Sequence, residues 1–503
     1  MFEAYFFDKR ATINYRVYRV LKALQNTAFT VNKLSQEAQL SYSQTYNAFQ
    51  DIMADLQTMS PKTVSTADEE AFNILAQNVS VDQYRFHLLN HSMAFAFFDY
   101  LFKTPTPDVH DFCTEHDISI STLRRRVEPF KAYLQSKGVT LNTSAWGLEG
   151  SELRIRMVIL NFFILGYRGA GWPLGNADCE LCLTECSRIA HTYQGQWFTA
   201  DPSLAKQDLL AMMVQHMRMQ QGNVLPQEVA FTRLTQAPGA QVLPDVIQAD
   251  KAWVSTNESG FFYFCRIHFL SLGTKPTAAD HWLIDHFKRR DSVVAHFADG
   301  LIHYLVAQNP DLLEVTAHDH ELLRANLYRI TYSYWLFGGD FSKRLDFYDE
   351  DRNAAAFGRL PALIDTYFQN LEGDAAAMRP YQGIMRRIIY GVVRDDFPEL
   401  DADHQLSVAV LIEPGTFTLR DILHFLDGIS FVKLAENTEH PDADVIITTL
   451  TSSELIDQYY GNDHAPLIQW QTIAQEEDYY RLYAELMRRH EEKNGNLSTG
   501  VEG

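Results

Sequence analysis

Three consecutive arginines follow a pair of hydroxyl side chains at the start of a predicted helix. Backbone amides and hydroxyl groups at the N-terminal end of a helix bind phosphate oxygens. A guanidinium group can donate two hydrogen bonds to the O6 and N7 atoms of guanine in the major groove of DNA. These residue types in this order predict contacts with double-stranded DNA by Ser121, Thr122, Arg124, Arg125 and Arg126.

The elements on either side of this helix favour the same ligand. Residues 109–115 have the apolar spacing of a short helix, and the chain breaks at residues 116–119. After the arginine-rich helix, residues 139–148 predict a short hairpin. Helix, tight turn, helix and hairpin is the order of a winged helix-turn-helix. The alternative is a helical hairpin that packs against protein, with the arginines in surface ion pairs, because three charged side chains in one turn are seldom buried.

Residues 31–56 predict a second helix-turn-helix unit. Apolar residues at positions 34, 38 and 40 precede a break at Ser41, and helical spacing resumes over residues 43–56. The start of that helix offers hydrogen-bonding side chains without positive charge. We expect DNA contacts here from Ser41, Ser43, Gln44, Thr45 and Asn47. A module that packs only against protein is the alternative.

The acidic balance of the chain is unevenly distributed. The formal net charge is −21, which by itself argues against nucleic acid as a partner. Residues 1–156, however, contain 16 Lys and Arg and 17 Asp and Glu, a net charge of −1. The remaining residues therefore hold nearly all of the excess negative charge. We expect one DNA-facing end and a solvated body that does not touch DNA.

The sequence does not have the features of secretion or membrane insertion. The first ten residues lack the basic start and the long apolar run of a signal peptide, and no apolar run reaches the roughly 18 residues of a membrane span. Five cysteines, an odd count, do not indicate a disulfide framework. We therefore expect a cytoplasmic protein that does not bind a membrane.

No set of residues predicts catalysis, a cofactor or a metal. Cys179, Cys182 and Cys186, with His191 nearby, have a spacing that suits a metal, but the same spacing places three cysteines on one apolar face of a helix. The patterns GxxxxGK[ST], GxSxG and HExxH do not occur. A single glycine in residues 413–416 is insufficient to predict a phosphate site. We expect a protein that is not an enzyme.

Apolar periodicity predicts a mainly α multidomain chain with a small α/β domain near its end. Strand runs at residues 406–412, 429–434 and 445–449 and a helix pattern at 416–426 predict a parallel sheet. The predicted order is a helix-turn-helix domain over residues 1–62, a winged helix-turn-helix domain over 63–150, all-helical domains over 151–275 and 276–398, an α/β domain over 403–490 and a flexible tail over 491–503.

Two stretches resemble a known DNA-binding family. Residues 120–125, Ile-Ser-Thr-Leu-Arg-Arg, and residues 150–156, Gly-Ser-Glu-Leu-Arg-Ile-Arg, resemble the recognition helix and the closing segment of the Mga-type helix-turn-helix. The predicted domain order is similar to that of the Mga/AtxA group of Gram-positive regulators. In that group, two helix-turn-helix units precede two helical regulatory domains of the sugar phosphotransferase system and an enzyme-IIB-like domain.

The resemblance implies a transcriptional regulator, and we expect an activator, that binds promoter DNA. It also implies a homodimer formed through the C-terminal domain. It further implies control by histidine phosphorylation through the phosphocarrier protein of the phosphotransferase system, for which His191, His216, His303 and His320 are the candidates. The sequence departs from the family pattern at Asn326, where a regulatory histidine is expected, and the IIB-like segment lacks the phosphorylatable cysteine.

Two other functions stay open at this point. One is an RNA-binding antiterminator, which would need an N-terminal β-module where this sequence predicts helices. The other is a phosphotransfer protein, which would need a histidine or cysteine in residues 413–416.

Overall fold

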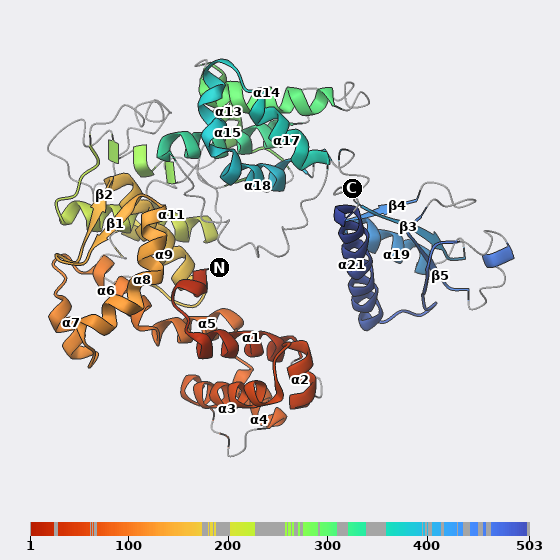
Figure 1. Cartoon of the computed structure of the whole chain (residues 1–503), viewed down its shortest axis with the longest axis horizontal. Coiled ribbons are helices and arrows are strands. Elements are labelled where there is room, and N and C mark those ends of the chain that lie inside the picture. The colour runs from red at the N-terminus through yellow and green to blue at the C-terminus, as the bar shows by residue number, and fades with distance from the viewer. Residues whose placement is uncertain are drawn as a thin grey trace. The chain divides into compact units, whose positions relative to one another are not determined.

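The computed structural model forms two compact units, residues 1–282 with 332–348 and residues 283–331 with 349–503. Helices dominate both units (Figure 1). The structure describes residues 2–24, 29–60, 62, 64, 68–173, 180, 182–184, 186–187, 202–226, 257–258, 260–262, 264–265, 270–271, 275–289, 292–308, 320–338, 359–394, 396–397, 400, 405–413, 417–429, 431–435, 443–450, 456–458 and 464–499.

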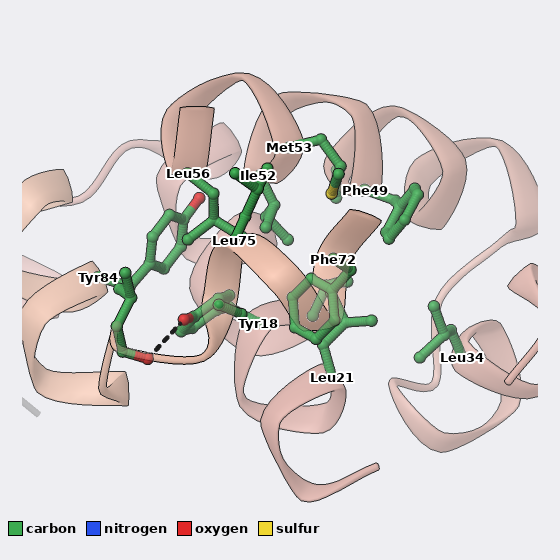
Figure 2. Packing of buried hydrophobic residues seen from close by; sticks show 14 of the residues in the cluster. Tyr18, Leu21, Leu34, Phe49, Ile52, Met53, Leu56, Phe72, Leu75 and Tyr84 are labelled. Atoms are coloured by element: carbon green, nitrogen blue, oxygen red, sulfur yellow. Dashed lines mark hydrogen bonds between the residues drawn. The ribbon is translucent and has the colours of Figure 1, made fainter. Parts of the chain in front are cut away.

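The first helical module consists of α1 (Lys9–Ala23), α2 (Val31–Glu37), α3 (Tyr42–Met59), α4 (Glu69–Ala76) and α5 (Val81–Asn90). Figure 2 shows its core, in which Tyr18 and Leu21 of α1 face Ile52 and Leu56 of α3. The Tyr18 hydroxyl donates a hydrogen bond to the Val79 carbonyl at 2.9 Å, so its polar atom is satisfied inside the core. This core fixes the orientation of α3.

The second module contains α6 (Met93–Lys103), α7 (Val109–Glu115), α8 (Ile120–Ser136), the hairpin β1 (Val139–Asn142) and β2 (Gly147–Gly150), and α9 (Glu152–Tyr167). Its core is aromatic. The Phe98 and Phe130 rings lie 4.5 Å apart, and the Phe95 and Phe162 rings 4.9 Å apart. Burial of each such ring contributes about 2–3 kcal/mol. Phe162 belongs to α9, so the helix beyond the expected boundary at residue 150 packs within this module.

The N-terminal 3₁₀ helix η1 (Phe2–Tyr5) joins the two modules. The Phe2 ring lies 6.0 Å from Phe162, and the Tyr5 ring lies 5.0 Å from Tyr133 of α8. The first residues of the chain therefore pack against the second module, although the sequence places them in the first. Later in the same compact unit, α11 (Pro202–Gln220) packs against α9.

Further helices follow: α13 (Ala278–Lys288), α14 (Val293–Ala307), α15 (Glu321–Phe337), α17 (Arg359–Gln369), the 3₁₀ helix η5 (Gly373–Tyr381) and α18 (Gln382–Val393). In the second compact unit α14, α17, η5 and α18 pack on one another. The expected helical character of residues 151–398 agrees with the described helices. Within the part of the chain that the structure describes, no helix is long and apolar enough to cross a bilayer.

The C-terminal part is an α/β structure, as the sequence predicts. It contains β3 (Leu406–Leu411), α19 (Phe417–Asp427), β4 (Val432–Leu434), β5 (Val445–Thr448), β6 (Leu467–Gln469) and α21 (Glu476–Thr499). The sheet is parallel throughout, in the order β4-β3-β5-β6. Residues 491–499, the first part of the expected flexible tail, continue α21. The Lys493 ammonium group donates to the Asp444 carboxylate at 2.7 Å and to the Gln405 carbonyl at 2.8 Å.

Candidate nucleic-acid interface

The turn between α7 and α8 presents the first residues of α8 to solvent. Asp117 adopts a φ of 50°, in the left-handed region that reverses the chain tightly. Ser119 is the N-cap, and its hydroxyl oxygen accepts a hydrogen bond from the Thr122 amide at 3.1 Å. The Ser121 and Thr122 hydroxyls lie 2.8 and 2.9 Å from the Ser119 hydroxyl. Ser121 and Thr122 therefore lie inside the first turn of α8, after the N-cap Ser119.

The two faces of α8 differ in burial. Leu123, Val127, Phe130 and Leu134 are fully buried in the module core. Because successive residues of an α-helix are rotated by about 100°, the side chains farthest from that core follow a different spacing. They form the outer stripe of α8, defined here as Ser121, Arg125, Glu128 and Ala132, all exposed.

The three arginines of α8 have different surroundings. Arg124 leans toward the hairpin, where its Nη2 lies 3.4 Å from the Thr143 carbonyl oxygen and its guanidinium lies 6.0 Å from the centre of the Trp146 ring. Arg125 lies in the outer stripe, and Arg126 lies on the opposite flank of the helix. All three are exposed, and Arg125 and Arg126 have no hydrogen-bond or ion-pair partner among the described residues.

The hairpin after α8 has the position of a wing. Gly138, at a φ of 69°, makes the sharp turn from α8 into β1. The Asn142 side-chain oxygen accepts hydrogen bonds from the Ser144 and Ala145 amides at 2.8 and 3.0 Å, which orders the hairpin tip. Trp146 is buried against Phe97, with ring centres 5.2 Å apart. The exposed tip, Ser144 and Ala145, is uncharged.

The first module repeats this geometry 78 positions earlier. Helices α2 and α7 are both seven residues long, and Val31 corresponds to Val109. Gln39 has a φ of 49°, as Asp117 has 50°. The Leu40 amide donates to the Ser35 carbonyl at 2.9 Å, and the matching bond joins Ile118 and Cys113 at 3.0 Å. The prediction of a second helix-turn-helix shape agrees with this segment, and α3 corresponds to α8.

The five residues predicted to contact DNA in the first module have three different environments. Ser41 is the N-cap of α3 and forms a reciprocal capping box with Gln44, so both side chains satisfy the backbone. Thr45 is fully buried and its hydroxyl donates to the Ser41 carbonyl at 3.0 Å. Thr45 therefore cannot reach DNA, and its prediction as a contact is corrected. Ser43 and Asn47 are exposed.

The outer stripe of α3, defined by the same geometry, comprises Ser43, Asn47, Gln50 and Ala54. Gln50 was not singled out from the sequence, although its position one helical turn after Asn47 would have indicated it. On an adjoining face, the exposed Tyr42 and Tyr46 rings stack nearly parallel, 6.4 Å apart.

Acidic side chains of α3 are directed toward protein partners. Asp51 accepts hydrogen bonds from the Arg10 guanidinium at 2.5 and 2.6 Å. Burial alone would raise the pKa of Asp55, but hydrogen bonds from His87 and Tyr84 outweigh it and hold this pKa below its usual value. These carboxylates are thus engaged by protein groups, and the outer stripe of α3 itself contains no charged residue.

The histidines proposed for phosphorylation differ in accessibility. His303 is exposed, with its Nδ1 2.7 Å from the Asp299 carbonyl oxygen. His216 is half-buried, and its Nε2 lies 2.8 Å from the Gln220 side-chain nitrogen. His320 is 7% exposed and stacks on Phe397, so this conformation does not offer its ring to a phosphate donor and its candidacy is corrected. His191 lies outside the described residues.

The cysteine spacing has no metal geometry in the described part of the chain. Cys182 is buried, and the Cys186 sulfur lies 3.8 Å from the Met212 sulfur. Cys179 lies outside the described residues, as does His191. Among the residues that the structure describes, no group of three His, Cys, Asp or Glu side chains could hold a metal ion.

Residues 77–163 match the Mga helix-turn-helix domain. The matched segment contains α5 to α8 and the hairpin, and it ends within α9. The resemblance to an Mga-type helix-turn-helix is confirmed for this segment. No curated protein matches the chain.

Proposed function

We propose that this protein is a transcriptional regulator of the Mga type and that α8 enters the major groove of promoter DNA. The observation that supports this most is the exposure of Arg125 and Arg126 on a helix within the segment that matches the Mga helix-turn-helix domain. Neither guanidinium is neutralised by a carboxylate of the described chain, so both charges are available to phosphates or base edges.

The three arginines have separate roles in this proposal. Arg125, at the centre of the outer stripe of α8, faces the base edges together with Ser121. Arg126 reaches the phosphates on one side of the groove. Arg124 holds the hairpin against α8 through Thr143 and Trp146, so that the hairpin tip follows the flanking DNA backbone.

The test is DNA binding by an Arg125→Ala/Arg126→Ala variant of the full chain. Each lost phosphate contact lowers the slope of log affinity against log salt concentration by about one unit. We expect the variant to bind duplex promoter DNA at least about tenfold more weakly at roughly 0.1 M salt, with a slope lower by one to two units. Fluorescence anisotropy over a salt series measures both quantities.

A matched control replaces two exposed arginines outside α8. Arg289→Ala/Arg481→Ala makes the same change in net charge at two surface ion pairs. This control should leave affinity and slope nearly unchanged. Equal effects of the two variants would remove α8 from the interface, and preferential binding of structured RNA over duplex DNA would favour an antiterminator.

We also propose three finer properties that extend this function. The regulator activates transcription, it forms a homodimer through residues 403–490, and the phosphocarrier protein of the phosphotransferase system phosphorylates it on His191, His216 or His303. The exposure of His303 supports the last property. Incubation with the phosphorylated carrier followed by mass spectrometry tests it. Failure to find phosphohistidine would remove this mode of control, and onward transfer of the phosphoryl group to sugar would instead indicate a phosphotransfer protein.

A further inference from the structure

We propose that the two helix-turn-helix modules read different base pairs, with α3 selecting A·T pairs and α8 selecting G·C pairs. The proposal rests on the DNA-binding function above and specifies the sequence preference of each helix. It makes Asn47 and Gln50 the specificity-determining residues of the first module, and Arg125 and Glu128 those of the second.

The two outer stripes can be compared residue by residue because the modules share one geometry. The correspondence of 78 positions pairs Ser43 with Ser121, and it continues through the rest of both stripes. The paired positions are Asn47 with Arg125, Gln50 with Glu128, and Ala54 with Ala132. The serine and the alanine are the same in both helices. The two positions between them differ, so the difference in chemistry lies where a recognition helix approaches base edges.

The side chains at the differing positions have distinct hydrogen-bonding capacities. An asparagine or glutamine amide offers a donor and an acceptor together, which matches N7 and N6 of adenine. A guanidinium offers only donors, which match O6 and N7 of guanine, and a carboxylate offers only acceptors, which match N4 of cytosine. Asn47 and Gln50 therefore suit an A·T pair, and Arg125 and Glu128 suit a G·C pair.

The surroundings of each stripe support this assignment. Asn47 is exposed and Gln50 half-buried, and neither has a hydrogen-bond partner in the described chain. Beside them the exposed Tyr42 and Tyr46 rings offer apolar contact to thymine methyl groups. In α8, the partner of Glu128 is Lys131 at 3.1 Å, and a surface pair of this kind is weak enough to exchange for a base.

The experiment is selection of duplexes from a randomised pool by the full chain, followed by competition anisotropy on the enriched sequence. We expect the enriched sequence to contain one block of A·T pairs and one block with G·C pairs. Exchanging A·T for G·C within the first block, or the reverse within the second, should cost wild type about tenfold or more in affinity.

The variants separate the two preferences. Asn47→Ala/Gln50→Ala should reduce the preference for A·T over G·C in the first block to about twofold or less and leave the preference in the second block unchanged. Arg125→Ala should reduce the preference for G·C in the second block and leave the first block unchanged. Asn47→Arg should add a preference for guanine in the first block, which is a gain that unfolding cannot imitate. Two controls are matched by residue type. Asn90→Ala, at the exposed end of α5, should change neither the affinity for DNA nor the base preferences. Arg126→Ala should lower the affinity for all duplexes equally and keep the base preferences.

The failure of this inference differs from the failure of the proposed function. If wild type binds no duplex, the DNA-binding function itself is wrong. If wild type selects a sequence but the Asn47, Gln50 and Arg125 variants keep its base preferences, the assignment of base pairs to helices is overturned. The assignment is also overturned if the Asn47 and Gln50 variant loses the G·C preference and the Arg125 variant loses the A·T preference.

Discussion

A buried ion pair holds the start of the chain against the segment that matches the Mga helix-turn-helix domain. The Arg85 side chain is fully buried and the Glu3 side chain is 4% exposed, and the two are joined by a hydrogen bond between guanidinium and carboxylate. Arg85 also donates to the Leu165 carbonyl at 2.7 Å and to the Gly166 carbonyl at 3.2 Å, at the end of α9. One guanidinium therefore connects η1, α5 and α9, and each of these contacts depends on Glu3 to balance the buried charge.

We predict that Glu3→Gln destabilises this region by about 3–5 kcal/mol near neutral pH, because it leaves the Arg85 charge buried without a counter-charge. Burial alone would raise the pKa of Glu3, but the charge and hydrogen bond of Arg85 outweigh it, so this pKa is lowered. A lowered pKa in the folded state means that the contribution is complete above the ordinary glutamate value of about 4.3 and is lost as the pH falls below it.

Urea unfolding followed by circular dichroism measures this effect at several pH values. The difference between wild type and Glu3→Gln should be full near pH 7 and should shrink progressively below about pH 4.3. Glu37→Gln, at an exposed position at the end of α2, should shift stability by less than about 0.5 kcal/mol. A difference between wild type and Glu3→Gln that stays constant with pH would exclude the ion pair as its cause.

At the scale of the element, α8 contains a residue that weakens it. Pro129 lies inside the helix and is exposed. Proline has no backbone N–H, so the Arg125 carbonyl loses the donor that position 129 would supply, and the ring crowds the preceding turn. The weakened turn begins at Arg125, the residue that we place in the groove. In the proposed complex, this helix is therefore weakened at the turn that would approach DNA.

We predict that Pro129→Ala stabilises the second module by about 2 kcal/mol, because it restores the helical hydrogen bond and removes the steric conflict. The higher conformational entropy of the unfolded alanine variant offsets part of this gain. Pro129→Gly restores the same hydrogen bond but should be about 1 kcal/mol less stable than the alanine variant. Thermal unfolding compares the three chains. Destabilisation by alanine would show that the proline conformation is favourable in this helix.

The sequence predicted elements well and side-chain partners poorly. Apolar periodicity located α8, the hairpin and the parallel sheet because those patterns are local and repeat every few residues. It could not show that Arg124 is engaged by Trp146, because that contact depends on how the hairpin folds back onto α8. Gln50 was missed and Thr45 was wrongly included because a one-residue rotation, about 100°, changes which side chains face outward.

At the scale of the whole molecule, a buried charge network joins the matched helix-turn-helix segment to the helices that follow it in the first compact unit. Arg156 of α9 is fully buried and donates to both carboxylate oxygens of Glu258, at 2.5 and 3.0 Å. Gln215 of α11 donates to the same carboxylate at 2.6 Å. On the rim of the network, Arg218 of α11 donates to both oxygens of Glu152, at 2.9 and 2.7 Å.

This network explains a residue that the sequence could identify only by resemblance. Arg156 closes the stretch, residues 150–156, that resembles the end of the Mga-type unit. The structure buries its guanidinium between α9 and the helical region beyond. The network therefore connects Glu258 and α11 to α9, whose Phe162 packs against Phe130 of α8 with ring centres 5.7 Å apart.

We predict that Glu258→Gln loosens the contact between α9 and α11 by about 3 kcal/mol, because Arg156 would lose its fully buried counter-charge and keep only Glu152, whose carboxylate lies 2.9 Å from its Nε. Replacing both partners, Arg156→Met/Glu258→Met, should destabilise the contact less than the two single changes added together, and the difference should exceed about 2 kcal/mol. The reason is that the double variant leaves neither charge of this pair buried alone.

Hydrogen exchange measured by mass spectrometry on α9 and α11 peptides reports this local stability. The surface pair Arg386 and Asp365 is the control, and its removal should cost less than about 1 kcal/mol. Strictly additive single and double variants would mean that Arg156 and Glu258 stabilise the region independently, and α9 would then not be coupled to the helical region through this charge pair.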